Sequence, residues 1–251
     1  LFQPDVILYV VDKRQELHFI QVFRCARKTG LVKEDTRLSF LGFGTMNGKD
    51  GKPFKTREGG VMRLENLIAD IDEEMFTKIV ENRSVRDKDA RDTAKIVGLA
   101  AIKYGDLSNQ ATKDYIFDVD RFTSFEGNTG PYILYTIVRI KSILNRYVEA
   151  GGNLEAGEIL PASNGSEKNL MLQLSGFGSM IESAFEEKAP HKICAYIYEV
   201  SNAFNSFYHE TKILSEENQA QKESYIRLLQ LTKRVLETSI DLLGFEAPDK
   251  M

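Results

Sequence analysis

Residues 6–11 are Val-Ile-Leu-Tyr-Val-Val, the longest uninterrupted apolar run in the chain. A β-branched run of this length is typical of a strand that is buried on both faces of a parallel sheet. A helical pattern follows over residues 13–29 and ends at Gly30, and a second strand fits residues 38–43. The first part of the chain is therefore predicted to be a β-α-β unit.

Beyond residue 63 the apolar residues recur at helical spacing. We expect helices over residues 64–80 and 93–104, the second ended by Gly105, and a long helix that begins at Pro131 and ends near residue 150. A loop is expected over 153–166, and the remaining helices are expected over residues 167–174, 177–187, 190–213 and 217–243. The predicted fold is an α/β piece followed by a mostly α-helical bundle, predominantly α overall, with a boundary near 121–131.

The composition is that of a globular protein with one large domain or two ordinary ones: 251 residues, of which 42% are hydrophobic and 28% charged. Two cysteines and three histidines lie too far apart in sequence to suggest a disulfide framework or a metal site. No apolar run is long enough to span a membrane, and no signal peptide is visible. We therefore expect a cytoplasmic protein without a membrane partner. Its first residue, Leu1, suggests a piece of a longer protein.

Charge is distributed unevenly along the chain. The net charge of the whole is −4, but residues 1–63 carry +5, residues 64–120 carry −5 and residues 121–251 carry −4. A basic start joined to an acidic body suggests an anion near the first segment. Chance clustering on a solvated surface explains the same numbers.

The glycine-rich stretch from Gly42 to Gly60 is predicted to be a loop rather than a helix or strand. Residues 42–47 have asparagine where a dinucleotide fingerprint needs its third glycine, and residues 44–50 do not match a P-loop. The stretch also carries four cations, which are Lys49, Lys52, Lys55 and Arg57. Because it follows a parallel strand, this lysine-rich loop (residues 49–57) is placed either to close over a polyphosphate or simply to be solvated.

Five blocks, in order along the chain, resemble arginyl-tRNA synthetases of the bacterial type, which are class I aminoacyl-tRNA synthetases. They are Val10–Phe19, Gly51–Arg57, Ser124–Tyr132, Asn202–Tyr208 and Leu243–Met251. The resemblance implies the C-terminal portion of such an enzyme. On this interpretation residues 1–63 are the last β-α-β unit of a Rossmann-type catalytic domain, residues 64–120 a helical connection, and residues 121–251 an anticodon-binding domain.

The resemblance also implies a function, arginine–tRNA ligase. The substrates would be L-arginine, ATP with Mg²⁺ and an arginine tRNA, without a tightly bound cofactor, in a complete enzyme that is a monomer. The upstream His-Ile-Gly-His-like signature of class I enzymes is absent, so we expect this chain to bind tRNA but not to complete catalysis. The alternative is a non-catalytic helical RNA- or protein-binding module. The acidic charge of residues 121–251 supports this alternative.

Residues of the first segment take roles from the resemblance. Gln15 matches a glutamine that binds the substrate arginine, although a polar residue at a helix N-terminus is the structural alternative. His18 is assigned to ATP, or else to packing, and the main chain of Phe43, Gly44, Thr45 and Met46 is assigned to adenine, with Gly44 permitting close approach. Lys52, Lys55 and Arg57 are the candidate catalytic cations, because Pro53 occupies the place of the first signature lysine.

The candidate anticodon-binding residues lie in the last two blocks. In the predicted helix over 190–213, an apolar stripe belongs to the core, and it consists of Ile193, Ile197, Val200, Phe204 and Phe207. Tyr196, Asn205 and Tyr208 fall off this stripe, where exposed aromatic rings suit stacking on anticodon bases. The resemblance adds Phe245 and Met251 of the C-terminal tail, for which packing of the chain end onto the bundle is the alternative.

Overall fold

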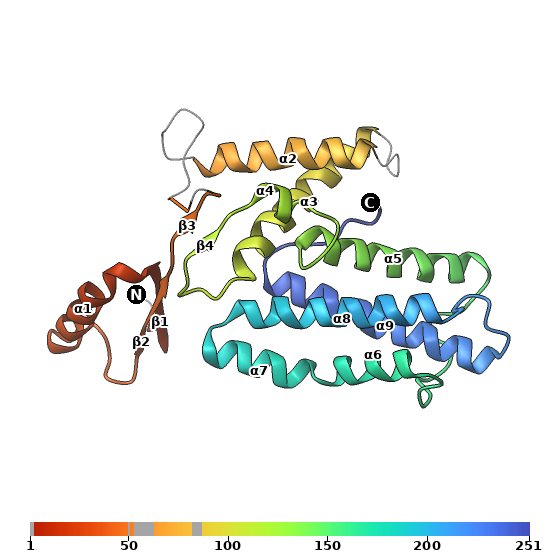
Figure 1. Ribbon diagram of the computed structural model, residues 1–251. Helices are drawn as coiled ribbons and strands as arrows, with labels where there is room; N and C mark the ends of the chain where they lie inside the picture. Colours follow the sequence, from red (N-terminus) through yellow and green to blue (C-terminus); the bar gives the residue numbers. More distant parts are fainter. Residues whose placement is uncertain (1–2, 50, 53–62, 82–86) are drawn as a thin grey trace. The chain divides into compact units, whose positions relative to one another are not determined.

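The computed structural model describes residues 3–49, 51–52, 63–81 and 87–251, and the chain divides into two compact units (Figure 1). Unit 1 comprises residues 1–61 and 109–117, and unit 2 comprises residues 62–108 and 118–251. Among the described residues, no helix is long and apolar enough to span a membrane. The functional division predicted at residues 63 and 120 stays a prediction.

Unit 1 contains a parallel pair of strands joined by a helix. Its elements are β1 (Val6–Asp12), the 3₁₀ helix η1 (Lys13–Gln15), α1 (Glu16–Lys28), β2 (Arg37–Phe43), β3 (Met46–Asn47) and β4 (Tyr115–Ile116). Strand β1 pairs with β2 from Val6↔Arg37 to Asp12↔Phe43. The predicted β-α-β unit is confirmed, and Gly30 follows α1 with a positive φ of 68°, as its helix-ending place requires.

The prediction that β1 is buried on both faces is wrong for the described residues. Helix α1 covers one face, where the ring of Phe19 lies 4.8 Å from that of Tyr9 and 5.7 Å from that of Phe40. On the other face Val6 and Val10 are 53% and 55% exposed. Within the described residues, β1 therefore has one face covered by α1 and one exposed face.

The segment from Gly42 to Gly60 includes an element that the sequence did not predict. Strand β3 pairs in parallel with β4, so that Met46 faces Tyr115 and Asn47 faces Ile116. A two-residue strand is stabilised by a partner about seventy positions away, and local composition does not report such a partner. Residues 53–62 lie outside the described residues.

Unit 2 is helical, as predicted. Its helices are α2 (Leu64–Glu81), α3 (Asp87–Leu107), α4 (Val119–Phe122), α5 (Gly130–Glu149), α6 (Gly165–Ser175), α7 (Phe177–Glu187), α8 (Pro190–Glu210) and α9 (Gln219–Leu242). Helix α3 continues through Gly105, contrary to the prediction. A Cβ on Gly105 would lie 2.6 Å from the ring of Phe122, so the glycine serves close packing of α4 rather than a helix end.

The core of unit 2 lies between α3, α5, α8 and α9, and the buried face of α2 extends it on the other side of α3 (Figure 1). The five residues of the apolar stripe on α8 are all buried, which confirms their assignment to the core. Helix α8 ends at Glu210, three residues before the predicted end. Gly244 has a φ of 80° and follows the end of α9, as expected for a glycine that closes a helix.

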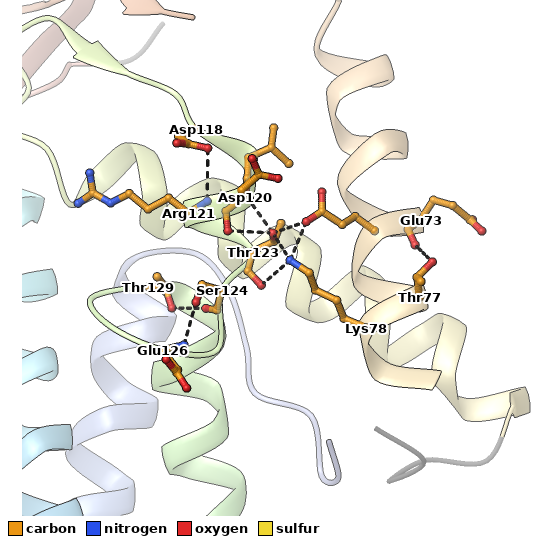
Figure 2. A network of polar contacts seen from close by, with 12 residues as sticks. Glu73, Thr77, Lys78, Asp118, Asp120, Arg121, Thr123, Ser124, Glu126 and Thr129 are labelled. Carbon is orange, nitrogen blue, oxygen red and sulfur yellow. Dashed lines mark hydrogen bonds and ion pairs between the residues drawn. The ribbon is translucent and has the colours of Figure 1, made fainter. Parts of the chain in front are cut away.

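A polar network fixes the start of α5 (Figure 2). The Thr123 hydroxyl lies 2.6 Å from the Glu74 carboxylate and accepts a hydrogen bond of 2.6 Å from Lys78 Nζ, both on α2. Six residues later the Thr129 hydroxyl donates to the carbonyl of Ser124 (2.6 Å) and caps α5. The loop over 123–129 thus connects α2 to the first turn of α5.

Gly130 begins α5 directly against α3. A Cβ at this position would overlap the carbonyl of Ala100, and Gly130 itself is buried. The close approach of the two helices therefore requires a residue without a side chain.

We predict that Gly130→Ala lowers the free energy of unfolding by about 1–3 kcal/mol, because α5 must shift away from α3. Urea unfolding followed by circular dichroism measures the change. Gly178→Ala on α7 is the matched control, since nothing lies within 4 Å of its Cβ, and it should leave stability unchanged or raise it by up to about 1 kcal/mol. Equal effects of the two substitutions would contradict the packing argument.

Candidate functional site

The carboxyl ends of β1 and β2 bring together the candidate residues of unit 1. Gln15 follows β1 through η1, and residues 43–46 run from the end of β2 to the start of β3. Gly42 allows the two connections to touch, because its Cβ would lie 2.8 Å from the Cα of Lys13. Ligands of open α/β sheets bind beyond this edge.

Asp12 holds the turn that carries Gln15. Its carboxylate accepts hydrogen bonds from the main-chain N of Arg14 (2.8 Å) and from the Arg14 guanidinium (2.9 and 2.6 Å). These side-chain and main-chain bonds from Arg14 lower the pKa of Asp12 to about 2. Gln15 stands at the N-cap position of α1 but makes no capping bond, and its side chain is exposed. The structure thus places Gln15 at a helix N-terminus, as its structural alternative expects, and its contact with arginine stays a prediction.

A second carboxylate joins the edge of unit 1 from far along the chain. Asp114 accepts an ion-pair hydrogen bond of 2.9 Å from Lys13 Nζ and one of 2.8 Å from the main-chain N of Thr45. The hydrogen bond from Lys13 lowers the pKa of Asp114. Neither Lys13 nor Asp114 was predicted from the sequence, since no local pattern connects residues 101 positions apart.

The segment assigned to adenine is occupied on one side by the chain itself. Gly44 N donates to the carbonyl of Ala111 (2.8 Å), and a Cβ on Gly44 would overlap the carbonyl of Lys113. The glycine is required by this internal contact. The expected approach of a nucleotide to its main chain stays a prediction. Alternate residues of a parallel strand direct their N–H and C=O groups to opposite edges. Although Met46 is paired in register with Tyr115, its own N–H and C=O groups therefore point away from β4.

The remaining candidates of unit 1 are exposed or lie outside the described residues. His18 is exposed on α1, with its ring 5.3 Å from that of Phe19 in an edge contact, and Phe43 is 43% exposed. Lys52 is exposed and closes a turn, where its carbonyl accepts from Gly48 N (2.8 Å). The predictions for Lys55 and Arg57, like the comment on Pro53, fall outside the described residues.

We predict that the Asp12 carboxyl, observed by ¹³C NMR, titrates near pH 2 rather than near its ordinary 3.8. Its pKa is lower in the folded state, so its contribution to stability is complete above about pH 4 and is lost as the pH falls through about 2. Arg14→Ala should return the titration toward 3.8, whereas the control Lys13→Ala should change it little. An ordinary midpoint in the unmodified chain would contradict this account of the turn.

In unit 2, Tyr196 does not lie with the other candidates on α8. Its hydroxyl donates to the carbonyl of Gln173 on α6 (3.0 Å), and its ring lies 6.2 Å from that of Phe177 on α7. Burial raises the pKa of this hydroxyl to about 12. Tyr208 follows twelve residues later, which is roughly 18 Å along a helix. The structure thus separates Tyr196 from Asn205 and Tyr208.

Asn205 and Tyr208 meet an arginine of α5. Arg139 donates to the Asn205 side-chain oxygen (2.8 Å). Its guanidinium carbon lies 4.7 Å from the ring centre of Tyr135 and 5.2 Å from that of Tyr208. Both tyrosines are partly exposed, at 42% and 37%. We call these four residues (Tyr135, Arg139, Asn205 and Tyr208) the α5–α8 surface.

Tyr135 and Arg139 were not predicted from the sequence. An aromatic residue and an arginine four positions apart, off the apolar positions of the predicted helix at 131–150, are the signal that could have identified them. Their partner Tyr208 comes from another helix, so the pairing itself appears only in the fold.

Beside Tyr208 the surface is hollowed by a pocket of about 390 Å³. Arg146 and Lys212 line this pocket together with the hydroxyl-bearing Thr211. Three cations therefore gather near two tyrosine rings, although residues 121–251 carry a net charge of −4. Aromatic faces stack on bases, and arginine and lysine neutralise phosphates, so the chemistry of this region suits single-stranded nucleic acid.

The C-terminal tail packs onto the bundle. Phe245 is 5% exposed, which fits the alternative of chain-end packing, and its assignment to the anticodon stays a prediction. Lys141 on α5 donates to the carbonyls of Ala247 and Pro248 (both 3.3 Å). Lys141 and Arg139 are two residues apart, roughly 200° around the helix, so they face different sides of α5. Met251 is partly exposed, and its assignment to the anticodon stays a prediction.

Within the ranges that the structure describes, no group of three histidine, cysteine, aspartate or glutamate side chains is arranged to hold a metal ion. The arrangement offers hydrogen-bonding and cationic groups instead.

Comparisons with known proteins find relatives for both parts of the chain. A family model described as "tRNA synthetases class I (R), catalytic domain" matches residues 2–119, and a second, "DALR anticodon binding domain", matches residues 133–251. The chain is 66% identical to an arginine–tRNA ligase of Agathobacter rectalis and 58% identical to one of Alkaliphilus oremlandii. These alignments cover 99% and 100% of the chain but only 43% and 42% of the relatives.

The similar solved structures include arginyl-tRNA synthetases. The chain resembles the arginyl-tRNA synthetase of Plasmodium falciparum with a TM-score of 0.81 and 26% identity, over 98% of this chain and 41% of that one. It resembles the Thermus thermophilus enzyme with a TM-score of 0.83 and 25% identity, over 97% and 41%. The chain thus spans less than half the length of these four proteins.

Proposed function

Because the chain belongs to the arginyl-tRNA synthetase family, we propose that it is part of an arginine–tRNA ligase and that its α5–α8 surface binds the anticodon of an arginine tRNA. The observation that carries the second proposal is the place of Arg139, whose guanidinium lies near two partly exposed tyrosine rings. The alternative of a non-catalytic helical RNA- or protein-binding module has less support, since the arginine–tRNA ligases align over both units.

The chemistry of the surface supports anticodon binding. Unpaired bases of an RNA loop are splayed and can stack on tyrosine rings, which contributes about 1–3 kcal/mol per base. The cations Arg146 and Lys212, beside the pocket, are placed to meet the phosphates that follow such a base. The amide of Asn205, in contrast, is bonded at both ends to protein groups: its oxygen accepts from Arg139 and its nitrogen donates to Tyr132. We therefore propose that Asn205 supports the surface and does not contact the RNA.

Unit 1 supplies the other half of the proposal, the amino acid and the nucleotide. Gln15 is proposed to bind arginine, and His18 with the main chain of residues 43–46 to bind ATP at the same sheet edge. In the parent reaction the arginine carboxylate attacks the α-phosphorus of ATP and pyrophosphate leaves. Lys52, Lys55 and Arg57 are proposed to neutralise the leaving phosphates. ATP enters with Mg²⁺ as a substrate, and no step is assigned to a protein-bound metal.

For the chain of 251 residues itself, the proposal is tRNA binding without completed catalysis, because the chain spans only 42–43% of its curated relatives. We expect no exchange of labelled pyrophosphate into ATP by the purified chain, and exchange above background would contradict this part of the proposal. The monomeric state and cytoplasmic location of the complete enzyme stay predictions.

We predict that Tyr208→Ala weakens binding of the anticodon stem-loop of an arginine tRNA by about one to two orders of magnitude, because one stacking face is lost. Fluorescence anisotropy with the purified chain measures the affinity. Phe185→Ala is the matched control, since this ring on α7 is 81% exposed and lies outside the α5–α8 surface. The affinity of this variant for the stem-loop should equal that of the unmodified chain.

A salt series separates this proposal from simple charge attraction. Anticodon preference that persists as salt rises is the expected result, because stacking and base contacts release few counterions. The contradicting result is binding that falls steeply with salt and whose affinity changes neither with the anticodon sequence nor with Tyr208→Ala. It would mean that the RNA binds a basic segment through its phosphates.

A further inference from the structure

The hydroxyl of Tyr132 on α5 bonds to two asparagines of α8, one of which, Asn205, belongs to the α5–α8 surface. It donates to the side-chain oxygen of Asn202 (2.7 Å) and accepts from the side-chain nitrogen of Asn205 (2.8 Å). The other end of the Asn205 amide accepts from Arg139 (2.8 Å). A continuous line of hydrogen bonds thus runs from Tyr132 to the guanidinium.

We propose that Tyr132 is a positioning residue for anticodon recognition: its hydroxyl sets the orientation of the Asn205 amide, and the amide in turn holds Arg139 between the rings of Tyr135 and Tyr208. The inference rests on the proposed binding of the anticodon at this surface. Tyr132 itself is not assigned a contact with RNA.

The orientation follows from counting protons. A tyrosine hydroxyl has one proton, and Tyr132 gives it to Asn202. Only its lone pairs remain for Asn205, which must therefore present its NH₂ group to Tyr132. The Asn205 oxygen then faces Arg139, a group that can only donate. A flipped amide would place NH₂ against the guanidinium and lose the bond from Arg139. Its oxygen would then compete with Asn202 for the single proton of Tyr132.

Tyr132 is suited to this task because both its ends are fixed. Its main-chain N donates to the Thr129 hydroxyl (3.2 Å), which is itself bonded to the carbonyl of Ser124 (Figure 2). Its ring lies 5.7 Å from that of Tyr198. Burial raises the pKa of the Tyr132 hydroxyl, so the proton stays in place at neutral pH.

Loss of the hydroxyl should affect discrimination more than affinity. The tyrosine faces of the surface remain available for stacking, which tolerates any base. The direction of the Arg139 donors, on which hydrogen bonding to a particular base edge depends, is no longer fixed. Tyr132→Phe removes the hydroxyl and keeps the ring.

The test compares two RNA hairpins, the anticodon stem-loop of an arginine tRNA and the same hairpin with its middle anticodon base changed. The ratio of their dissociation constants measures discrimination by the 251-residue chain. We expect Tyr132→Phe to reduce this ratio by about five- to tenfold, the worth of one hydrogen bond between neutral groups. An unchanged ratio would overturn the inference.

Tyr225→Phe is the control for loss of a phenol hydroxyl in the same bundle. The Tyr225 hydroxyl lies 3.0 Å from the Ser163 hydroxyl, and the residue is 3% exposed. Its removal should lower the thermal midpoint at least as much as Tyr132→Phe does, yet leave the ratio unchanged. A loss of discrimination in both variants would indicate a general structural effect and overturn a positioning role.

Two second-site variants show whether Tyr132 acts through Asn205 and Arg139. In an Asn205→Asp background the carboxylate offers an oxygen to Arg139 in either orientation, so Tyr132→Phe should have no further effect on the ratio. In an Arg139→Met background it should also have none. Additive losses in both backgrounds would mean that Tyr132 touches the RNA itself and would overturn the inference.

The failure of the proposed function gives a different result. If Arg139→Met alone changes neither affinity nor the ratio, then the anticodon does not bind at this surface, and the positioning role falls with it. If Arg139→Met lowers the ratio but Tyr132→Phe does not, then the binding site stands and only the inference about Tyr132 is overturned.

Discussion

The capped start of α5 is the constraint on which the helical unit depends. Thr129 supplies the cap, and Gly130 brings the helix so close to α3 that a methyl group would overlap the carbonyl of Ala100. A helix fixed in this way presents a definite stripe of residues, because side chains four positions apart share a face. Tyr135 and Arg139 owe their place beside Tyr208 to this start, and Tyr132 connects the same turn to α8.

Local charge matters more here than net charge. Residues 121–251 carry −4, which taken as a whole argues against RNA binding, yet Arg139, Arg146 and Lys212 gather beside aromatic rings. RNA meets the field of the surface that it touches, and more distant charges are screened within about 10 Å at ordinary salt. The net charge of a segment is also a poor guide in unit 1. Its cations Lys13 and Arg14 form ion pairs with Asp114 and Asp12 at the sheet edge, so they contribute to its structure.

Periodicity in the sequence was enough for the β-α-β unit and for most helices, since burial of one face imposes the spacing. It misjudged Gly105, whose role is contact with Phe122 rather than a helix end, and it missed β3, whose partner lies far along the chain. The candidate site was predicted less well, because its pairs form only in the fold. Arg139 meets Tyr208, and Lys13 meets Asp114, across 69 and 101 positions, and no single-sequence pattern reports such contacts.

The most direct test of the account is photo-crosslinking of the chain to an arginine tRNA anticodon stem-loop that carries one photoreactive anticodon base, with the modified peptides identified by mass spectrometry. The account predicts cross-links to α5 and α8 at Tyr135 and Tyr208, abolished by excess unlabelled hairpin. Cross-links confined to residues 3–49 of unit 1, or to α6 and α7 around Tyr196, would contradict the claim that the anticodon binds at the α5–α8 surface.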